Sequence, residues 1–213
     1  MHLFKNKTFL CVCGMAAGAL VSRADPIPYP NVGTQNPVTY TFTAAATGQI
    51  DAYFAGSGAG YTEEVEMLVN GTATGVFGLN NQTSHAGEEF DLGSVVAGDS
   101  IVFVDYIQTT GAYVYSNPAD NTGGYAGQNH IYSTAATAGQ AYAGSPAGTY
   151  VAFEDLPGNS ADWNYHDDTF VFTNVNLQPS NAASAPDGGA TITMFGIALL
   201  GLCAMRRGRF ARA

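Results

Sequence analysis

Short segments of alternating apolar and polar residues fill the middle of the chain and constrain its fold more than any other feature. In each segment every second residue is apolar, which is typical of a strand with one buried face. Turn signals such as Asn70-Gly71 and Pro157-Gly158 separate the segments. We expect strands at residues 38–43, 50–54, 65–69, 100–106, 149–153 and 169–172. No stretch has a sustained 3.6-residue apolar period, so we predict an all-β domain, a jelly-roll-like antiparallel β-sandwich.

The charged residues divide the chain into a central region and two ends. All 17 acidic residues lie between Asp25 and Asp187, whereas the seven lysines and arginines all lie outside that span. The three cysteines also lie in the end segments, so the central region has no disulfide framework and no cysteine-ligated metal. So acidic a surface repels phosphates, which excludes nucleic-acid binding. It needs cations to limit its self-repulsion, supplied either by bound divalent ions or by a salty medium.

The first 24 residues have the composition of a secretory signal peptide. Lys5 and Lys7 precede an apolar run at 9–21. The small residues Ser22 and Ala24 then stand three and one positions before a cleavage site ahead of residue 25. We predict cleavage there by signal peptidase, with an uncleaved membrane anchor as the alternative.

The C-terminus has the features of a second targeting signal. A small polar linker ends in a turn-favouring motif made of Pro186, Asp187, Gly188 and Gly189. Residues 190–205 form a short apolar stretch that we predict to be a single hydrophobic helix. A basic stop follows it, made of Arg206, Arg207, Arg209 and Arg212. These arginines predict a cytoplasmic tail, with the acidic domain on the outer side of the membrane.

This order of motif, apolar helix and arginine cluster resembles the bacterial PEP-CTERM class of sorting signals, in its VPDSG-CTERM variant. Ala185 stands in place of the valine of that variant and Gly188 in place of the serine. The resemblance implies processing by an exosortase-type enzyme, membrane attachment through the helix during transit, and a final location at the cell surface or in the extracellular matrix. It also implies exopolysaccharide or biofilm matrix as a partner. A permanent single-pass anchor is the alternative.

These features predict six parts of the chain. They are a signal peptide at 1–24, an N-terminal extension at 25–36, a β-sandwich domain at 37–178, a linker with the sorting motif at 179–189, a hydrophobic helix at 190–205 and a basic cytoplasmic tail at 206–213.

The loop between the last two expected strands concentrates negative charge. It holds five carboxylates within 15 residues and has no basic residue near it. Carboxylates packed together repel one another and raise one another's pKa unless a metal compensates them. Oxygen ligands on a flexible, glycine-containing loop suit Ca²⁺, which takes six to eight oxygens at irregular angles. We therefore predict a calcium site, with a solvated acidic loop whose Asp and Asn side chains cap turns as the alternative.

The same loop resembles DUF4114, a domain of uncharacterised function in secreted bacterial proteins. The Phe-Glu-Asp-Leu element of that family is intact at 153–156, and its Asp-x-Asp-Tyr-Asn-Asp element corresponds to 162–167, with Asn164 and His166 as departures. The resemblance implies a calcium-dependent secreted protein. Its side-chain ligands here would be Glu154, Asp155, Asp162 and Asp167, with Asn164 as a weaker carbonyl ligand and Asp168 either as a further ligand or facing solvent.

The sequence favours a non-enzymatic protein. A glycoside hydrolase needs two carboxylates across a cleft, and no strand-embedded glutamate pair is framed by aromatic residues. A serine hydrolase would need a Gly-x-Ser-x-Gly elbow, which the chain lacks. We expect a surface or matrix protein stiffened by calcium. The alternative is a carbohydrate-binding module that stacks sugars on Trp163 and on tyrosines of the segment 111–148, and a glycoside hydrolase is less favoured.

Overall fold

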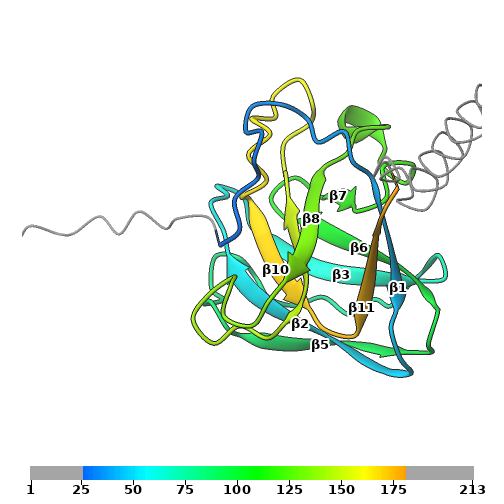
Figure 1. The fold of residues 1–213 in the computed structure, drawn as a ribbon. Helices are drawn as coiled ribbons and strands as arrows, with labels where there is room; N and C mark the ends of the chain where they lie inside the picture. Colours follow the sequence, from blue (N-terminus) through cyan, green and yellow to red (C-terminus); the bar gives the residue numbers. More distant parts are fainter. Residues whose placement is uncertain (1–25, 181–213) are drawn as a thin grey trace, which may run out of the picture.

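The computed structural model describes residues 26–180, which form eleven strands and one short 3₁₀ helix (Figure 1). The elements are β1 (Tyr40–Ala44), β2 (Gly48–Gly56), β3 (Glu63–Val69), β4 (Thr72–Ala73), β5 (Glu89–Val95), β6 (Ser100–Ile107), β7 (Ala112–Tyr115), η1 (Gly123–Tyr125), β8 (Ile131–Ala136), β9 (Gly148–Phe153), β10 (Asp168–Phe172) and β11 (Val175–Pro179). All pair antiparallel in two sheets. The first sheet has the order β11-β1-β6-β3-β4, with β7 also paired to β6, and the second has the order β5-β2-β10-β9-β8.

This arrangement confirms the all-β prediction, and the jelly-roll connectivity stays a prediction. Each of the six expected segments overlaps one strand: β1, β2, β3, β6, β9 and β10. The Asn70-Gly71 turn joins β3 to β4, and both of its residues have the positive φ (50° and 78°) that a tight hairpin turn requires. The expected segments do not include β5, β7, β8 and β11, nor the two-residue strand β4.

Both predicted targeting signals lie outside the described residues. This applies to the signal peptide, the sorting motif, the hydrophobic helix and the basic tail. Within residues 26–180 no helix is long and apolar enough to cross a membrane. Most of the expected N-terminal extension is described, and it packs against the sandwich. The Tyr29 ring in it is buried and lies 5.2 Å from the Tyr132 ring and 4.8 Å from the Tyr165 ring.

Phenylalanines from both sheets fill the space between them. The Phe103 ring of β6 stacks on the Phe172 ring of β10, with their centroids 3.8 Å apart and their planes 13° apart, and Phe42 of β1 meets Phe103 edge-on. Fully burying one such side chain contributes about 1.5–3 kcal/mol. These contacts therefore fix the two sheets face to face, and they fix the inward register of β6 and β10.

The second sheet is also covered on its outer face around β9 and β10. All five residues of β10 are buried, and a second apolar cluster lies on that face, with Tyr150, Ala152 and Val171 beneath Tyr29 and Tyr165. A central strand covered on both faces is apolar at successive positions, as 170–172 are. The segment before β1 and the loop between β9 and β10 supply this cover.

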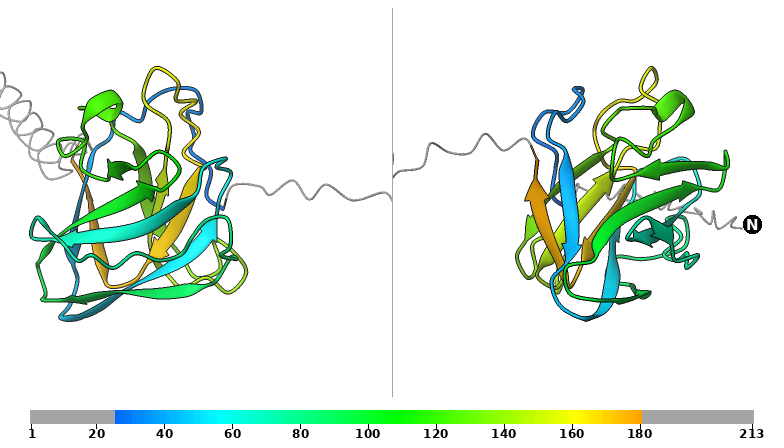
Figure 2. Two further views of the ribbon diagram at one scale, coloured as in Figure 1. Left: turned by 180° about the vertical axis from the view of Figure 1, so that it is seen from behind. Right: turned by 90° about the vertical axis from the view of Figure 1, so that its right-hand side faces the viewer.

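Three connecting segments gather at one end of the sandwich, and Figure 2 shows them together from two sides. They are the chain before β1, the segment around η1 and the loop between β9 and β10. Hydrogen bonds join them: the Asn36 backbone N–H donates to the Tyr165 hydroxyl (2.7 Å), and the Tyr125 hydroxyl donates to the Asp155 carbonyl (3.0 Å). The acidic loop is thereby held over the adjoining ends of β3, β6 and β10.

Candidate metal centre

Six carboxyl groups meet at this end of the sandwich in two groups of three. We call Glu154, Asp155 and Asp167 the loop cluster, and Glu63, Asp105 and Asp168 the inter-sheet cluster. In each cluster one carboxylate oxygen from every residue lies within 4.8 Å of the others. Calcium–oxygen bonds are 2.3–2.6 Å long, so ligand oxygens on opposite sides of one ion lie about 5 Å apart. In each cluster the three oxygens are therefore close enough together for one cation to contact all of them.

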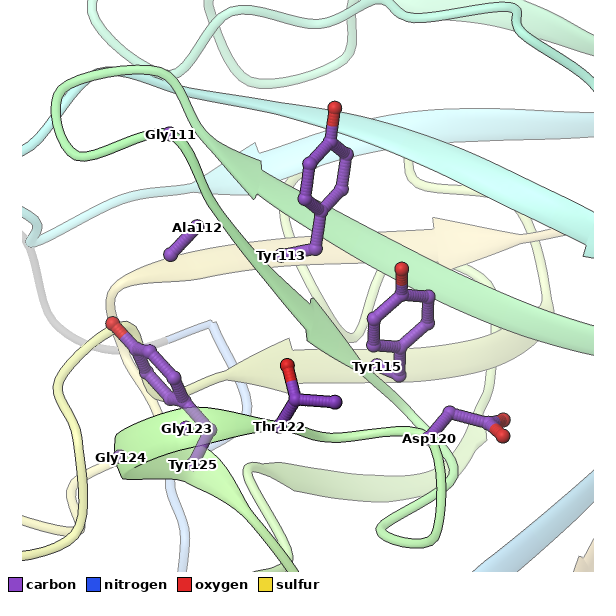
Figure 3. A pocket seen from close by; sticks show the side chains of 9 residues that line it. All are labelled: Gly111, Ala112, Tyr113, Tyr115, Asp120, Thr122, Gly123, Gly124 and Tyr125. Atoms are coloured by element: carbon purple, nitrogen blue, oxygen red, sulfur yellow. The ribbon is translucent and has the colours of Figure 1, made fainter.

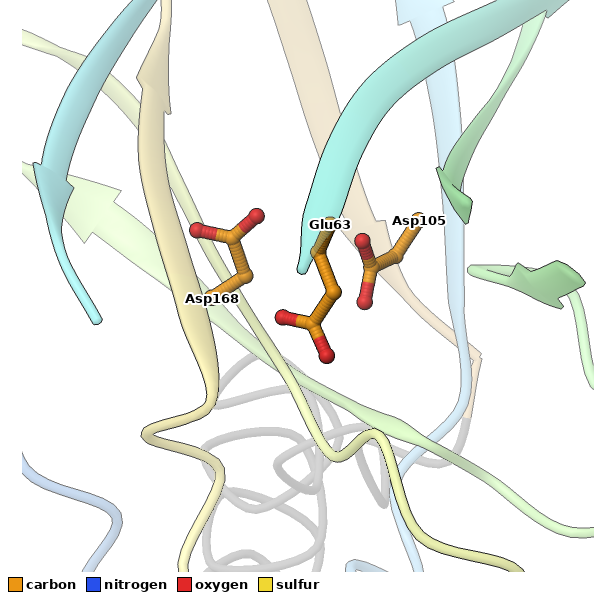
Figure 4. Close-up of side chains that lie close together, drawn as sticks. All are labelled: Glu63, Asp105 and Asp168. Carbon is orange, nitrogen blue, oxygen red and sulfur yellow. The ribbon is translucent and has the colours of Figure 1, made fainter. Parts of the chain in front are cut away.

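The inter-sheet cluster follows from the register of three strands. Asp105 stands two residues after Phe103 in β6, and Asp168 two residues before Phe170 in β10, so both carboxyl groups share the inward face with those rings. Glu63 opens β3 in the same register as buried Val65. Figure 4 shows the three side chains close together, with that of Asp105 directed toward Glu63. Three acidic residues thus occupy inward-facing strand positions that are usually apolar.

These three carboxyl groups are fully buried and have few hydrogen-bond partners among the described residues. Each residue is 0% exposed, and neither oxygen of Asp105 accepts a hydrogen bond from any residue between 26 and 180, whereas the Asp168 carboxylate interacts with the backbone N–H of Thr169. Glu63 Oε2 accepts one, from Asn81 Nδ2 at 3.2 Å. Burial raises the pKa of all three well above the usual range, and neighbouring carboxylates raise it further. An isolated buried carboxylate without a partner is among the costliest groups in a protein.

The loop cluster is built by the chain leaving β9. The Glu154 carbonyl oxygen lies 3.1 Å from His130 Nδ1, and the Asp155 N–H donates to Asp167 Oδ2 at 2.9 Å. Burial, then the charge of Asp162, raises the pKa of Glu154 to about 7. Burial, then the charge of Asp155, raises that of Asp167 to about 9. Glu154 Oε2 is buried and has no hydrogen-bond partner among the described residues.

Asp155 joins the two clusters. Asp155 is 3% exposed, and its carboxyl group interacts with that of Glu63 closely enough to raise the pKa of Glu63. Its charge also raises the pKa of Asp105.

Of the five ligands expected from the sequence, Glu154, Asp155 and Asp167 converge, whereas Asp162 and Asn164 lie at the rim. Asp162 is exposed, and its carboxylate accepts hydrogen bonds from the Asn164 N–H (3.0 Å) and Nδ2 (2.8 Å). This is the turn-capping arrangement that the sequence left as an alternative for the loop. Asp168, for which a solvent-facing position was one expectation, belongs instead to the buried inter-sheet cluster.

Trp163, a residue of the loop between β9 and β10, is half-buried and packs against neighbouring rings. Its ring centroid is 5.2 Å from that of His130 and 6.0 Å from that of Tyr165. Trp163 and Tyr165 both adopt positive φ, 53° and 54°, which is unusual for large side chains and costs about 1–3 kcal/mol each. The Tyr165 hydroxyl donates to the Asn129 carbonyl at 3.0 Å and helps hold this strained loop in place.

The tyrosines of segment 111–125 line a shallow groove of about 330 Å³ (Figure 3). Along the sheet beside it, Tyr113 stacks on Tyr106 with centroids 4.6 Å apart and planes 22° apart, and Tyr115 follows at 6.4 Å and 26°. Tyr113 is 40% exposed and the other two are half-buried. The Tyr106 and Tyr113 rings therefore each cover one face of the other.

The metal-free protein is expected to lose stability as the pH rises from about 4 toward about 9. Glu154 and Asp167 have pKa values raised to about 7 and about 9 from ordinary values of 4.5 and 3.8. The folded state therefore binds more protons than the unfolded chain, and its stability is greatest below the ordinary values and falls as the pH passes through the raised ones. Urea unfolding in EDTA at about pH 5, 7 and 9 measures this trend. A rise in unfolding free energy over this range would contradict it.

Comparison with known proteins finds one match, at the C-terminus. Residues 186–209 match a family model described as the VPDSG-CTERM motif, which confirms the expected PEP-CTERM-type sorting signal. The motif implies an exported, membrane-transiting protein that an exosortase-type enzyme processes. No curated protein and no solved structure matches the chain. The resemblance of the acidic loop to DUF4114 stays a prediction.

Proposed function

We propose that this exported chain is a non-enzymatic surface protein whose β-sandwich binds calcium through the loop cluster. The observation that carries the proposal is the convergence of Glu154, Asp155 and Asp167, within 4.8 Å of one another, in a domain without a lysine or arginine. The Glu154 Oε2 atom, buried without a partner among residues 26–180, is a ready ligand atom. A divalent cation supplies the opposite charge that the chain itself does not.

The donor set favours calcium over a transition metal. All three ligands are carboxylates, which hard cations prefer, and the central region has no cysteine. The nearby imidazole of His130 is already engaged, with Nδ1 near the Glu154 carbonyl and Nε2 3.3 Å from Gln128 Oε1. Burial lowers the pKa of His130 to about 4, so its ring stays neutral and supplies no balancing charge.

The geometry of the carboxylates argues against glycoside hydrolysis. The paired carboxyl groups of such enzymes stand about 5–5.5 Å or 6.5–9.5 Å apart, on either side of a sugar. Here the oxygens of each cluster approach within 4.8 Å, and every member except Asp167 is buried, which leaves no space for a sugar between them. Nor do we propose carbohydrate binding, because Tyr106 and Tyr113 stack on each other and Trp163 packs on His130.

Calcium is expected to stabilise the purified protein against heat. Extracellular calcium modules bind with dissociation constants of about 10⁻⁴–10⁻³ M, so roughly 10 mM calcium adds about 1.5–3 kcal/mol per site. For a domain of this size that raises the unfolding midpoint by about 3–12 °C relative to EDTA. Differential scanning calorimetry at constant ionic strength measures the shift.

Matched variants locate the effect. Asp167→Asn keeps the shape of a ligand but removes its charge, and the calcium shift is expected to shrink. Glu64→Gln makes the same kind of change on β3, where the carboxylate points away from both clusters and meets Asn80 Nδ2 at 3.4 Å. Its shift is expected to equal that of the wild type. Equal shifts with sodium and with calcium at matched ionic strength would reduce the loop cluster to a solvated acidic surface.

A further inference from the structure

We propose that the inter-sheet cluster binds a second divalent cation, coordinated by Glu63 and Asp105 of one sheet and by Asp168 of the other. The inference deepens the proposed function, on which it rests for the identity of the ion as calcium. It does not depend on the loop cluster being occupied, because its three ligands come from three other elements. Its consequence is that an ion, and not apolar packing alone, closes this end of the sandwich.

The first support is the completeness of the burial together with the lack of partners. All three side chains are 0% exposed, and neither oxygen of Asp105 has a hydrogen-bond partner among residues 26–180. Buried polar atoms are hydrogen-bonded in the great majority of cases, so a fully buried carboxylate with two orphaned oxygens points to a missing partner. The partner must be positive, since it faces carboxylates from three directions.

The second support is the way in which strand pairing aims these groups at one point. Glu63 pairs with Ile107 and Val65 with Asp105, so Glu63 and Asp105 are diagonal neighbours on the inner face of the same sheet. Asp168 faces them from β10, whose neighbour at that position is Phe153 of β9. A binding site thus exists in the backbone register itself and needs no loop rearrangement.

The third support is charge balance. The two clusters hold six carboxyl groups, and the described part of the chain has no lysine or arginine to offset them. One divalent ion in the loop cluster would leave four of the six charges uncompensated in a buried setting. A second ion would leave two.

Calcium stoichiometry tests the inference directly. The full-length protein, stripped with EDTA and dialysed, is titrated with calcium chloride in a calorimeter and checked by equilibrium dialysis. The wild-type protein is expected to bind two calcium ions per chain. Asp105→Asn is expected to bind one, retained by the loop cluster, and Asp167→Asn is expected to bind one, retained between the sheets. Glu64→Gln is the charge-matched control and is expected to bind two.

The other outcomes separate this inference from the proposed function. One ion in the wild type, kept in Asp105→Asn and lost in Asp167→Asn, overturns the second site and leaves the loop site standing. One ion with the reverse pattern overturns the loop site and supports the inter-sheet site. A single ion lost in both variants means one shared site and overturns the second ion. No calcium bound to the wild type overturns both. If Asp105→Asn fails to fold, Asp168→Asn removes another ligand of the inter-sheet site and takes its place in the test.

Discussion

In EDTA at about pH 8, the double variant Asp105→Asn, Asp168→Asn is expected to unfold at a higher temperature than the wild type, yet to gain only about half as much from calcium. At this pH each buried carboxyl group must either stay charged without a partner or take up a proton. Taking up a proton costs about 1.4 kcal/mol for each unit by which the pH exceeds the ordinary pKa of the carboxyl group. An amide of the same shape carries neither cost.

The size of the effect follows from the number of charges removed. Removing two fully buried carboxyl groups, which face no lysine or arginine in the described part of the chain, is expected to stabilise the metal-free protein by about 2–4 kcal/mol. This raises the midpoint by about 4–16 °C for a domain of this size. The introduced amides can also donate hydrogen bonds to Glu63 or Asp155. In calcium the advantage shrinks, because the variant lacks the inter-sheet ligands and keeps only the loop cluster.

A surface variant separates the effect of removing a buried charge from the effect of removing any charge. Asp120→Asn removes a carboxylate that is exposed and bonded to Asn117 Nδ2 at 2.8 Å. It is expected to change the midpoint little, whether in EDTA or in calcium, since such surface substitutions usually stay within about 0.5 kcal/mol. If the double variant were less stable than wild type in EDTA and kept the full calcium gain, the inter-sheet carboxylates would be structural groups and not ligands.

Phe103→Ala is expected to destabilise the domain by about 3–5 kcal/mol, enough to leave it marginal or unfolded at growth temperature. Phe103 is fully buried, stacks on Phe172 of the opposite sheet at 3.8 Å and meets Phe42 at 5.2 Å. Its removal leaves a cavity at the contact between the sheets. Denaturant titration followed by circular dichroism measures the loss in both EDTA and calcium.

The matched truncation is Tyr113→Ala, which removes a partly exposed ring from the same sheet. Its expected cost is about 1 kcal/mol, because the ring is 40% exposed and its loss opens no enclosed cavity. Comparable losses for Phe103→Ala and Tyr113→Ala would show that the inter-sheet aromatic packing does not dominate stability.

The sequence predicts the strands best where one face is buried and the other is wet. β1, with its alternation of buried Tyr40, Phe42 and Ala44, is such a case, and so is β2. The strands that the sequence does not predict either consist largely of polar and small residues or lie at the edge of a sheet. β11 has no fully buried residue and β8 carries Ser133 and Ala135, so neither presents a clear apolar period. Their formation depends on pairing partners distant in the chain.

The loop cluster is predicted in part because its members are close in sequence. The inter-sheet cluster is missed because Glu63, Asp105 and Asp168 are far apart in the chain. A signal for it nevertheless exists: each acid occupies the inward register of its strand, two residues from buried Val65, Phe103 or Phe170. An acid at an inward strand position is unusual enough to mark a site. Only the fold shows that the three positions meet.

The pairing of the first strand with the last determines how the domain meets a mechanical load. β11 lies at the edge of its sheet and pairs with β1 through five residue pairs, from Tyr40–Pro179 to Ala44–Val175. Ser180 follows β11, and the sorting motif comes later in the sequence, at 186–209. Tension applied through the C-terminus therefore reaches the β1–β11 pair first. The carboxylate clusters lie on or beside β3, β6, β9 and β10, so peeling β11 away would not pull directly on the strands that present the ligands.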